Sequence, residues 1–199
     1  MATILNAARN GNANRVRAFL NGGANANEFD DGWTPLQAAA ARGHLNVVRL
    51  LIRRGANVNA RDFSGWTALH GAALEGRLNV VQELIRHGAY VNARTRLGVT
   101  PLHFAAEFGH VQVVRALVEA GAKLSYRNVN GQTPLNKARN NNTRSALGAR
   151  AAKTMLNAAN RRRVNAMRQT LSHMPVREGT SVRRGLPQNI LNLIAKRIR

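Results

Sequence analysis

A threonine recurs along this chain at a constant spacing of 33 residues. The copies are Thr34, Thr67, Thr100 and Thr133, and the residues around each of them match in kind. A chain that repeats itself at such a period builds similar structural units, and each unit buries its apolar face by stacking on its neighbours. The period therefore predicts an array of stacked repeats.

Each threonine lies at the junction between an expected turn and an expected helix. A glycine shortly before it suits a tight turn, because glycine has no β-carbon. The threonine hydroxyl can cap the helix, and proline or alanine at the next position suits the first helical residue. The glycines are Gly32, Gly65, Gly98 and Gly131, and the residues after the threonines are Pro35, Ala68, Pro101 and Pro134.

Two helices are expected in each unit. Small apolar pairs in the first helix allow neighbouring helices to approach closely, and a glycine then ends that helix. A second amphipathic run follows, such as residues 44–53, and a Gly-Ala motif ends it before the next turn. The small pairs are Ala39 and Ala40, Ala72 and Ala73, and Ala105 and Ala106, and the glycines that end the first helices are Gly43, Gly76 and Gly109.

These motifs resemble the ankyrin repeat, whose pattern is a turn, a TPLHxAA helix, a Gly-His break, a VVxxLL helix and a GAxVNA exit. The resemblance covers residues 1–147 and implies an all-α ankyrin-repeat solenoid of helix-turn-helix repeats with β-turn or hairpin connections. It also implies a non-enzymatic protein-binding module. The expected divisions are a degenerate cap at 1–28, full repeats at 29–61, 62–94 and 95–127, and a degenerate cap at 128–147.

The net charge of +21 is distributed unevenly. Residues 1–136 contain 15 Lys and Arg against 8 Asp and Glu, a net +7, whereas residues 137–199 contain 15 against the single Glu178, a net +14. A change in composition thus coincides with the end of the repeats. Apolar residues at helical spacing over 144–171 predict a basic C-terminal helical tail. Its expected parts are a basic helix at 148–172, a linker at 173–185 and a terminal amphipathic helix at 186–199.

The terminal helix has the spacing LPxxIxxxIxxxI, which includes Leu186, Pro187, Ile190 and Ile194. This spacing resembles the opening helix of an F-box, by which substrate receptors bind the Skp-type adaptor of cullin-RING ubiquitin ligases. Ankyrin arrays with a truncated C-terminal F-box-like segment occur in large DNA viruses, and the resemblance implies that these four residues contact the adaptor. Because so short a helix is marginal in water, it must dock on something. The alternatives are that it packs on the terminal repeat or lies on a membrane surface.

Ankyrin repeats leave their turn tips and one face of their first helices exposed, and these form a concave surface. Here that surface is rich in Trp and Arg, the types most enriched among energetically important interface residues. We expect a protein target there, and a locally acidic one, because arginines recur at a spacing of 33. Alternatively, the tryptophans pack against neighbouring turns and the arginines form a solvated row. The predicted protein-binding residues are Trp33, Arg42, Arg61, Phe63, Trp66, Leu74, Arg94, Glu107, Phe108 and Arg127.

Other classes of function find little support in the sequence. The chain has no cysteine, which excludes disulfides and a thiol nucleophile, and no histidines and carboxylates share metal-ligand spacing. We therefore expect no enzyme activity, no cofactor and no metal. Neither a transmembrane run nor a signal-peptide pattern is found. A monomeric protein of the cytoplasm or nucleus is expected, in the host cell if the source is a virus.

Nucleic acid is the alternative partner. A tail with a net charge of +14 would bind phosphate through charge, and such binding would fall steeply with salt. Residues 137–199 contain no Phe, Tyr or Trp that could stack on bases. The run Arg161, Arg162 and Arg163 could contact phosphate or form part of a nuclear import signal.

Overall fold

The computed structural model describes residues 3–172, apart from the side chains of residues 150–159, 163, 167, 168 and 170–172. The chain divides into two compact units, residues 1–155 and residues 156–199. The repeat array belongs to the first unit. The linker and the terminal helix expected at 173–199 lie outside the described residues.

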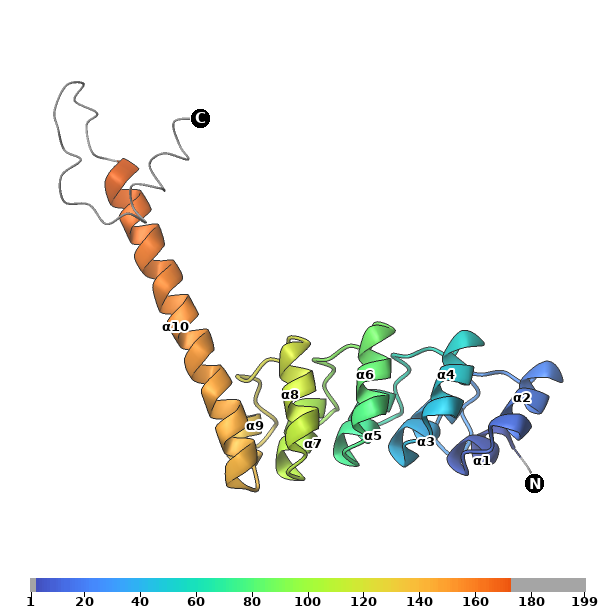
Figure 1. Cartoon of the computed structure of the whole chain (residues 1–199). Helices are drawn as coiled ribbons and strands as arrows, with labels where there is room; N and C mark the ends of the chain where they lie inside the picture. Colours follow the sequence, from blue (N-terminus) through green and yellow to red (C-terminus); the bar gives the residue numbers. More distant parts are fainter. Residues whose placement is uncertain (1–2, 173–199) are drawn as a thin grey trace. The chain divides into compact units, whose positions relative to one another are not determined.

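Short helices build the repeat array and follow one another in pairs (Figure 1). A few residues around a glycine separate the helices of a pair, and a longer loop leads to the next pair. The helices of the described residues are α1 (Ile4–Arg9), α2 (Ala13–Asn21), α3 (Pro35–Arg42), α4 (Leu45–Arg53), α5 (Ala68–Leu74), α6 (Leu78–Arg86), α7 (Pro101–Glu107), α8 (Val111–Glu119), α9 (Pro134–Lys137) and α10 (Asn141–Ser172).

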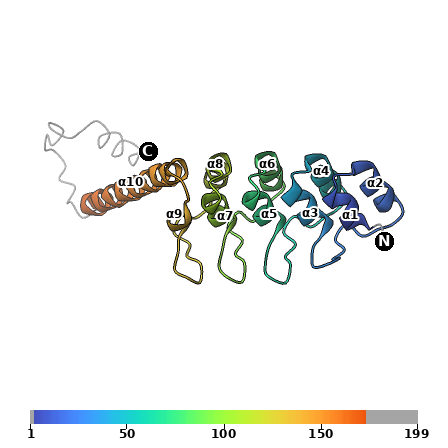
Figure 2. The same cartoon turned by 90° about the horizontal axis from the view of Figure 1, so that it is seen from below.

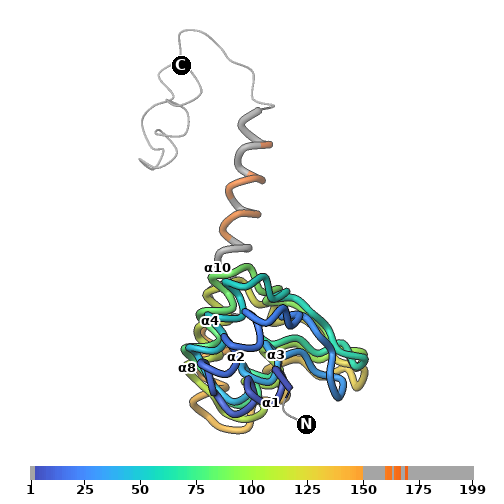
Figure 3. The backbone as a smooth tube through the Cα atoms, turned by 90° about the vertical axis from the view of Figure 1, so that its right-hand side faces the viewer, coloured from blue at the N-terminus to red at the C-terminus, as the bar shows by residue number. Residues whose placement is uncertain are grey.

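The helices of the array lie in two layers (Figure 2). α1, α3, α5, α7 and α9 pack side by side in an inner layer, and α2, α4, α6 and α8 form an outer layer. The longer loops, which we call fingers, project together on one side of the array (Figure 3). They comprise residues 30–33, 62–66, 95–99 and 128–132. No strand occurs among residues 3–172, and the predicted all-α solenoid is confirmed.

Capping residues set the starts of the inner helices. Thr34 accepts a hydrogen bond from the backbone N–H of Gln37 at 3.2 Å, and the Gln37 side chain accepts from the backbone N–H of Thr34 at 2.8 Å. These two bonds satisfy donors that the helix itself leaves unpaired. Thr100 and Thr133 cap α7 and α9 in the same way, which confirms the predicted helix starts.

A continuous apolar core lies between the inner and outer layers. Each full repeat contributes one deeply buried leucine from each of its helices, and the alanine pairs of the inner helices are buried as well. Truncating a core leucine to alanine removes about 2–5 kcal/mol of stability. The leucines, none of them more than 1% exposed, are Leu36, Leu51, Leu69, Leu84, Leu102 and Leu117.

A side chain at the start of α4, of α6 and of α8 binds back to the preceding repeat. The His110 ring lies 2.8 Å from the carbonyl of Leu74. A β-carbon at Gly76 would lie 2.6 Å from that ring, so glycine is needed there for space as well as for its φ of 66°. In the repeat at 62–94, Arg77 replaces the usual histidine and donates to the carbonyl of Ala41 at 3.2 Å.

The first finger has a tighter turn than the others. Asp30 and Trp33 exchange two backbone hydrogen bonds of 3.1 Å, and Asp31 and Gly32 between them have φ of 54° and 76°. Positive φ at both central residues is the pattern of type I′ hairpin turns. Later fingers contain an additional residue in this turn, as residues 62–66 do.

The last repeat closes with the start of α10. After the short α9, Asn140 caps α10 by accepting from the backbone N–H of Thr143 at 2.8 Å. Leu147 of α10 is only 1% exposed and packs in the core. The helix predicted over 144–171 is observed as α10, which begins at Asn141 and ends at Ser172. One helix therefore spans the expected boundary between residues 147 and 148.

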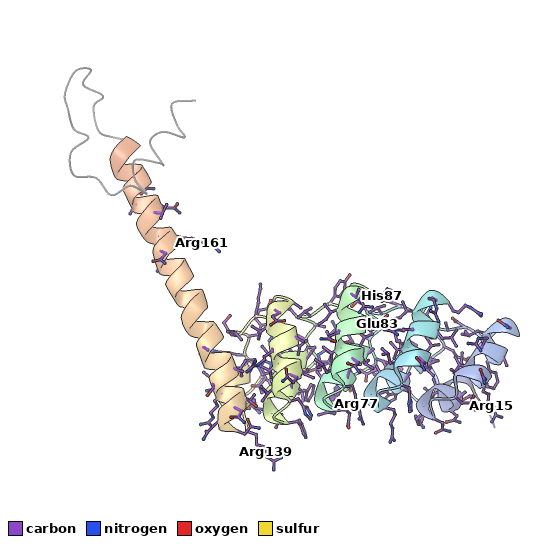
Figure 4. The ribbon with its side chains drawn as sticks, in the orientation of Figure 1. Arg15, Arg77, Glu83, His87, Arg139 and Arg161 are labelled. Atoms are coloured by element: carbon purple, nitrogen blue, oxygen red, sulfur yellow. The ribbon has the colours of Figure 1, made fainter. Side chains whose placement is uncertain are left out.

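A buried carboxylate lies in the outer layer (Figure 4). Glu83 of α6 is 3% exposed and occupies the position that Leu50 has in α4. Its Oε2 lies 3.1 Å from Arg49 and 2.7 Å from Arg86, and its Oε1 lies 3.3 Å from the His87 ring. The hydrogen bond from Arg49 holds the pKa of Glu83 below its usual value, so this carboxylate is ionised at neutral pH.

Two kinds of feature are absent from residues 3–172. None of their helices combines the length and the apolar character that crossing a bilayer requires. No three of their His, Asp and Glu side chains come together as metal ligands would.

Candidate protein-binding surface

The fingers and the inner helices together form one surface, which we call the finger face. Large apolar side chains are exposed at its finger tips: Phe63 is 78% exposed, Leu97 62% and Val129 65%. Phe108, which follows the last residue of α7, is 48% exposed. Exposed apolar residues are unremarkable singly, but gathered on one face they mark an interaction surface.

Backbone hydrogen bonds join successive finger tips. The N–H of Arg96 donates to the carbonyl of Ser64 at 2.8 Å, and the N–H of Val129 donates to the carbonyl of Leu97 at 3.0 Å. The fingers at 62–66, 95–99 and 128–132 therefore form a connected row. The row holds the exposed apolar tips on a rigid backbone.

The recurring arginines also tie the fingers together. Arg61 donates to the carbonyl of Arg94 at 2.5 Å, and Arg94 donates to the carbonyl of Arg127 at 2.9 Å. Arg127 directly precedes the last finger, 128–132, and donates to the carbonyl of Gly131 within that finger at 2.6 Å. Neither interpretation of these arginines from the sequence anticipated such bonds. All three residues are exposed, so they also make the finger face positive.

Glycine leaves room for these arginines. A β-carbon at Gly98 would lie 2.8 Å from the Nη2 atom of Arg94, and Gly98 has the left-handed φ of 71°. The Arg94 guanidinium also lies 5.5 Å from the centroid of the Tyr126 ring, within cation–π distance. A backbone carbonyl and an aromatic ring thus hold one arginine in place.

Buried polar side chains link the inner helices α3, α5 and α7 to the next finger. His70 accepts at Nδ1 from the backbone N–H of Thr67 at 3.1 Å, and its Nε2 lies 3.2 Å from the carbonyl of Val99. This pair of contacts requires a neutral ring with its proton on Nε2. His103 makes the equivalent contacts with Thr100 and Gln132, and Gln37 makes them with Thr34 and Trp66.

Burial controls the ionisation of both histidines. Burial lowers the pKa of His70 from 6.5 to about 4, and burial also lowers the pKa of His103. Protonation would place a second ring N–H against the backbone N–H of the helix cap. Both rings are therefore neutral at physiological pH and add nothing to the charge of the finger face.

Trp66 belongs to an aromatic cluster. Its ring centroid lies 4.5 Å from that of Phe104, at an interplanar angle of 36°, and 6.0 Å from that of His70. The ring packs against the following repeat and is still partly exposed. Trp33 in the first finger is partly exposed as well.

A hollow of about 300 Å³ opens beside this cluster, between the last two fingers. At one edge the carboxylate of Glu107 pairs with the ammonium group of Lys137 at 2.6 Å. The volume is at the small end of the range for ligand pockets, which suits one side chain rather than a whole ligand. The apolar side chains that line it are those of Trp66, Leu97, Val99, Phe104 and Val129.

The other predicted residues of this surface lie at the ends of inner helices. Arg42 ends α3 and is exposed, and Leu74 ends α5 and is partly buried. Glu107 ends α7 at the edge of the hollow. The hollow thus brings together Trp66 and Glu107 of the predicted set, while Phe63 and Phe108 stay exposed outside its lining.

The predicted residues of the tail are described only in part. Arg161 and Arg162 are exposed on α10, and the side chain of Arg163 is outside the described part of the chain. The predicted adaptor-binding residues Leu186, Pro187, Ile190 and Ile194 also lie outside the described residues.

Eight residues that line the hollow were not predicted, although the repeat register held a signal for two of them. Val129 lies two periods after Phe63, at the same position in its finger. Phe104 is large where the two preceding inner helices, α3 and α5, have the small Ala38 and Gly71. The stacking of Phe104 on Trp66 depends on contact between repeats and has no local signal. The eight residues are Thr95, Leu97, Val99, Phe104, Asn128, Val129, Asn130 and Lys137.

Helix pairs stacked in two layers, with a row of exposed fingers, define a repeat solenoid that presents an extended surface to a partner. Residues 4–95 match the family model described as Ankyrin repeats (3 copies), and residues 84–138 match that described as Ankyrin repeats (many copies). The chain therefore belongs to the ankyrin-repeat family and is a protein–protein interaction module. Among curated proteins, none matches the chain.

Proposed function

We propose that this protein is a non-enzymatic receptor that binds a protein target on its finger face. The observation that supports this most is the set of exposed apolar tips, Phe63, Leu97 and Val129, on fingers joined by backbone hydrogen bonds. The fold does not use these side chains, and a partner would remove them from water. In this proposal the contacts also come from Trp33, Arg42, Arg61, Trp66, Leu74, Arg94, Glu107, Phe108 and Arg127.

The target is locally acidic in this proposal. Arg61, Arg94 and Arg127 are exposed while their bonds to carbonyls fix their positions. Because little side-chain entropy is left to lose on binding, a positioned arginine is a better contact for a carboxylate than a mobile one.

The test is affinity capture from cell lysate at physiological salt with nuclease present, followed by quantitative mass spectrometry. The full chain is compared with Phe63→Asp on the finger face and with Tyr90→Asp, which changes a side chain of similar exposure, 68%, outside that face. We expect proteins that the full chain and Tyr90→Asp retain and Phe63→Asp loses. Identical sets of proteins for all three chains would contradict the proposal.

For the C-terminal segment we propose that Leu186, Pro187, Ile190 and Ile194 bind a Skp-type adaptor, which would make the protein a substrate receptor of a cullin-RING ubiquitin ligase. The support is the LPxxIxxxIxxxI spacing. The same capture with a chain that ends at Gly185 tests it. Adaptor and cullin recovered only with the full chain would support this role, and their absence from both captures would contradict it. In a virus, this role would place the protein in the cytoplasm or nucleus of the host cell.

Nucleic-acid binding through the tail is the second candidate function. It is favoured by the net charge of +14 over residues 137–199 and by the exposure of Arg161 and Arg162 on α10. Most of this charge precedes Gly185, so a chain that ends there should still bind DNA or RNA, and the affinity should fall steeply with salt. Binding that does not respond to salt would contradict a purely electrostatic contact.

A further inference from the structure

The hollow beside Trp66 has the shape and lining of a site for one apolar side chain. Trp66 and Phe104 form an aromatic wall, and Leu97 and Val129 extend the apolar lining to the finger tips. Leu97 and Val129 are themselves 62% and 65% exposed. An apolar side chain that entered the hollow would fill it and also cover both tips. Binding energy in protein interfaces concentrates in such well-desolvated pockets.

Basic residues lie in and beside the two fingers that form this hollow. Arg96 belongs to the third finger, Arg94 and Arg127 directly precede the third and the fourth, and Lys137 lines the edge of the hollow. Glu107 is the acidic side chain of the lining, and Lys137 already pairs with it at 2.6 Å. A carboxylate brought close to the hollow would therefore meet a net positive field.

The opposite end of the finger row has the reverse charge. Glu28, Asp30 and Asp31 lie in or beside the first finger, and no lysine or arginine occurs between Arg17 and Arg42. The finger face is thus acidic at the first finger and basic at the third and fourth. A partner that lies along the fingers would meet these two fields in a fixed order.

We infer that the finger face binds an extended peptide segment with a bulky apolar residue beside carboxylates at one end and basic residues at the other. The apolar residue enters the hollow, its neighbouring carboxylates face Arg94, Arg96, Arg127 and Lys137, and the basic end faces the first finger. This inference rests on the proposed function, because it assigns a partner to the same surface.

The length of the segment follows from the spacing of the repeats. Packed helices lie about 8–10 Å apart, so the first finger and the hollow, which are between two and three repeats apart, are separated by about 25 Å. An extended chain rises about 3.3 Å per residue. The apolar anchor should therefore lie about seven or eight positions along the segment from its basic end.

Two synthetic peptides of identical composition test the inference. The peptide KKSGSGSFDE places its carboxylates beside Phe and its lysines at the far end, and EDSGSGSFKK exchanges the charges. Both have the same net charge, so non-specific attraction to the basic tail is the same for both. Fluorescence anisotropy of each labelled peptide, titrated with the full chain, measures the affinities. We expect KKSGSGSFDE to bind at least about tenfold more tightly, since tenfold corresponds to about 1.4 kcal/mol.

Two surface variants locate the binding. Val129→Asp puts a carboxylate at the hollow, and Tyr90→Asp makes the same kind of change at a side chain of similar exposure elsewhere. We expect Val129→Asp to abolish the preference between the peptides and Tyr90→Asp to preserve it. Equal binding of the two peptides, no saturable binding of either, or a preference that survives Val129→Asp would each overturn the inference. If capture from lysate still depends on Phe63 in that case, the proposed function stands and only the identity of the segment is wrong.

Discussion

Replacing His70 with glutamine should reduce the loss of stability that the repeat array suffers at acid pH. The free energy of unfolding at neutral pH should stay nearly unchanged. Gln37 shows why glutamine fits at this position. Its Oε1 accepts from the backbone N–H of Thr34 at 2.8 Å, and its Nε2 donates to the carbonyl of Trp66 at 3.0 Å. These are the contacts that His70 makes with Thr67 and Val99, and glutamine makes them without titrating.

The size of the effect follows from the pKa of His70. Burial lowers this pKa from 6.5 to about 4. Between these two values the unfolded chain binds the proton and the folded chain does not, so the free energy of unfolding falls as the pH falls. One pH unit corresponds to about 1.4 kcal/mol, which gives a loss of about 2 kcal/mol from pH 7 to pH 5 and about 3 kcal/mol in total below pH 4.

The assay is urea denaturation, followed by far-UV circular dichroism, of the original chain and His70→Gln at several pH values between 4.5 and 7.5. At pH 7 the two free energies of unfolding should agree within about 1.5 kcal/mol, because the substitution roughly conserves volume. Between pH 7 and pH 5 the free energy of unfolding of the variant should fall by about 2 kcal/mol less than that of the original chain. His103 stays in both chains, so its own lowered pKa affects both equally.

A titration of the ring followed by NMR provides an independent check. His70 should remain neutral at pH 6, with its proton on Nε2, and titrate near pH 4. If the ring titrates near 6.5, or if both chains lose stability with pH at the same rate, the argument that His70 is a buried neutral link is refuted.

Three further predictions concern single side chains, each measured by urea denaturation. A left-handed backbone costs alanine about 1–2 kcal/mol. Gly98→Ala should destabilise the array by more than this, because its β-carbon would also contact Arg94. Gly88→Ala is the control for the backbone effect alone, since Gly88 has a similar φ of 80° and open space around it. Glu83→Leu should leave stability unchanged or raise it by about 1–4 kcal/mol, as buried ion pairs replaced by apolar residues often do, and a clear loss would contradict this. Leu84→Ala should remove about 2–5 kcal/mol, because this side chain is fully buried.

The sequence predicted the repeat frame well, because the signals for it are local. Thr34 and Pro35 mark a helix start through the physics of a single helix end, and Gly76 marks a turn through its own backbone freedom. Because these signals repeat at a period of 33, the sequence indicates an array of stacked helical repeats.

Contacts between repeats could not be predicted in the same way. Arg61 and Arg94 were expected to form an exposed row, and each instead also donates to the carbonyl of the arginine that directly precedes the next finger. Arg77 supplies the contact to the preceding repeat that histidine makes elsewhere, although it looks like a loss of the Gly-His motif. Both outcomes depend on how far a long side chain reaches across a neighbouring repeat, which the local pattern does not contain.

The first finger shows a partial failure of the periodic argument. The threonine spacing of 33 starts after this finger, so it does not reveal that the finger is shorter. The pair Asp31 and Gly32 was a signal for the tight hairpin, since both residue types accept positive φ. Directly before the shorter finger, Phe29 occupies the position at which later repeats have an arginine, so the row of arginines begins only at Arg61.

The links between repeats have a consequence for how such a gene can change. His70 binds a carbonyl of the next repeat, and His110 binds one of the preceding repeat, each at a fixed place in the period. If an internal unit were duplicated or deleted as a whole, every donor would meet an equivalent acceptor in its new neighbour. At the last finger, 128–132, Arg127 instead binds a carbonyl of the finger that directly follows it, and this arrangement needs no further finger. Recombination in steps of one whole repeat can therefore lengthen or shorten the binding surface while the chain still folds.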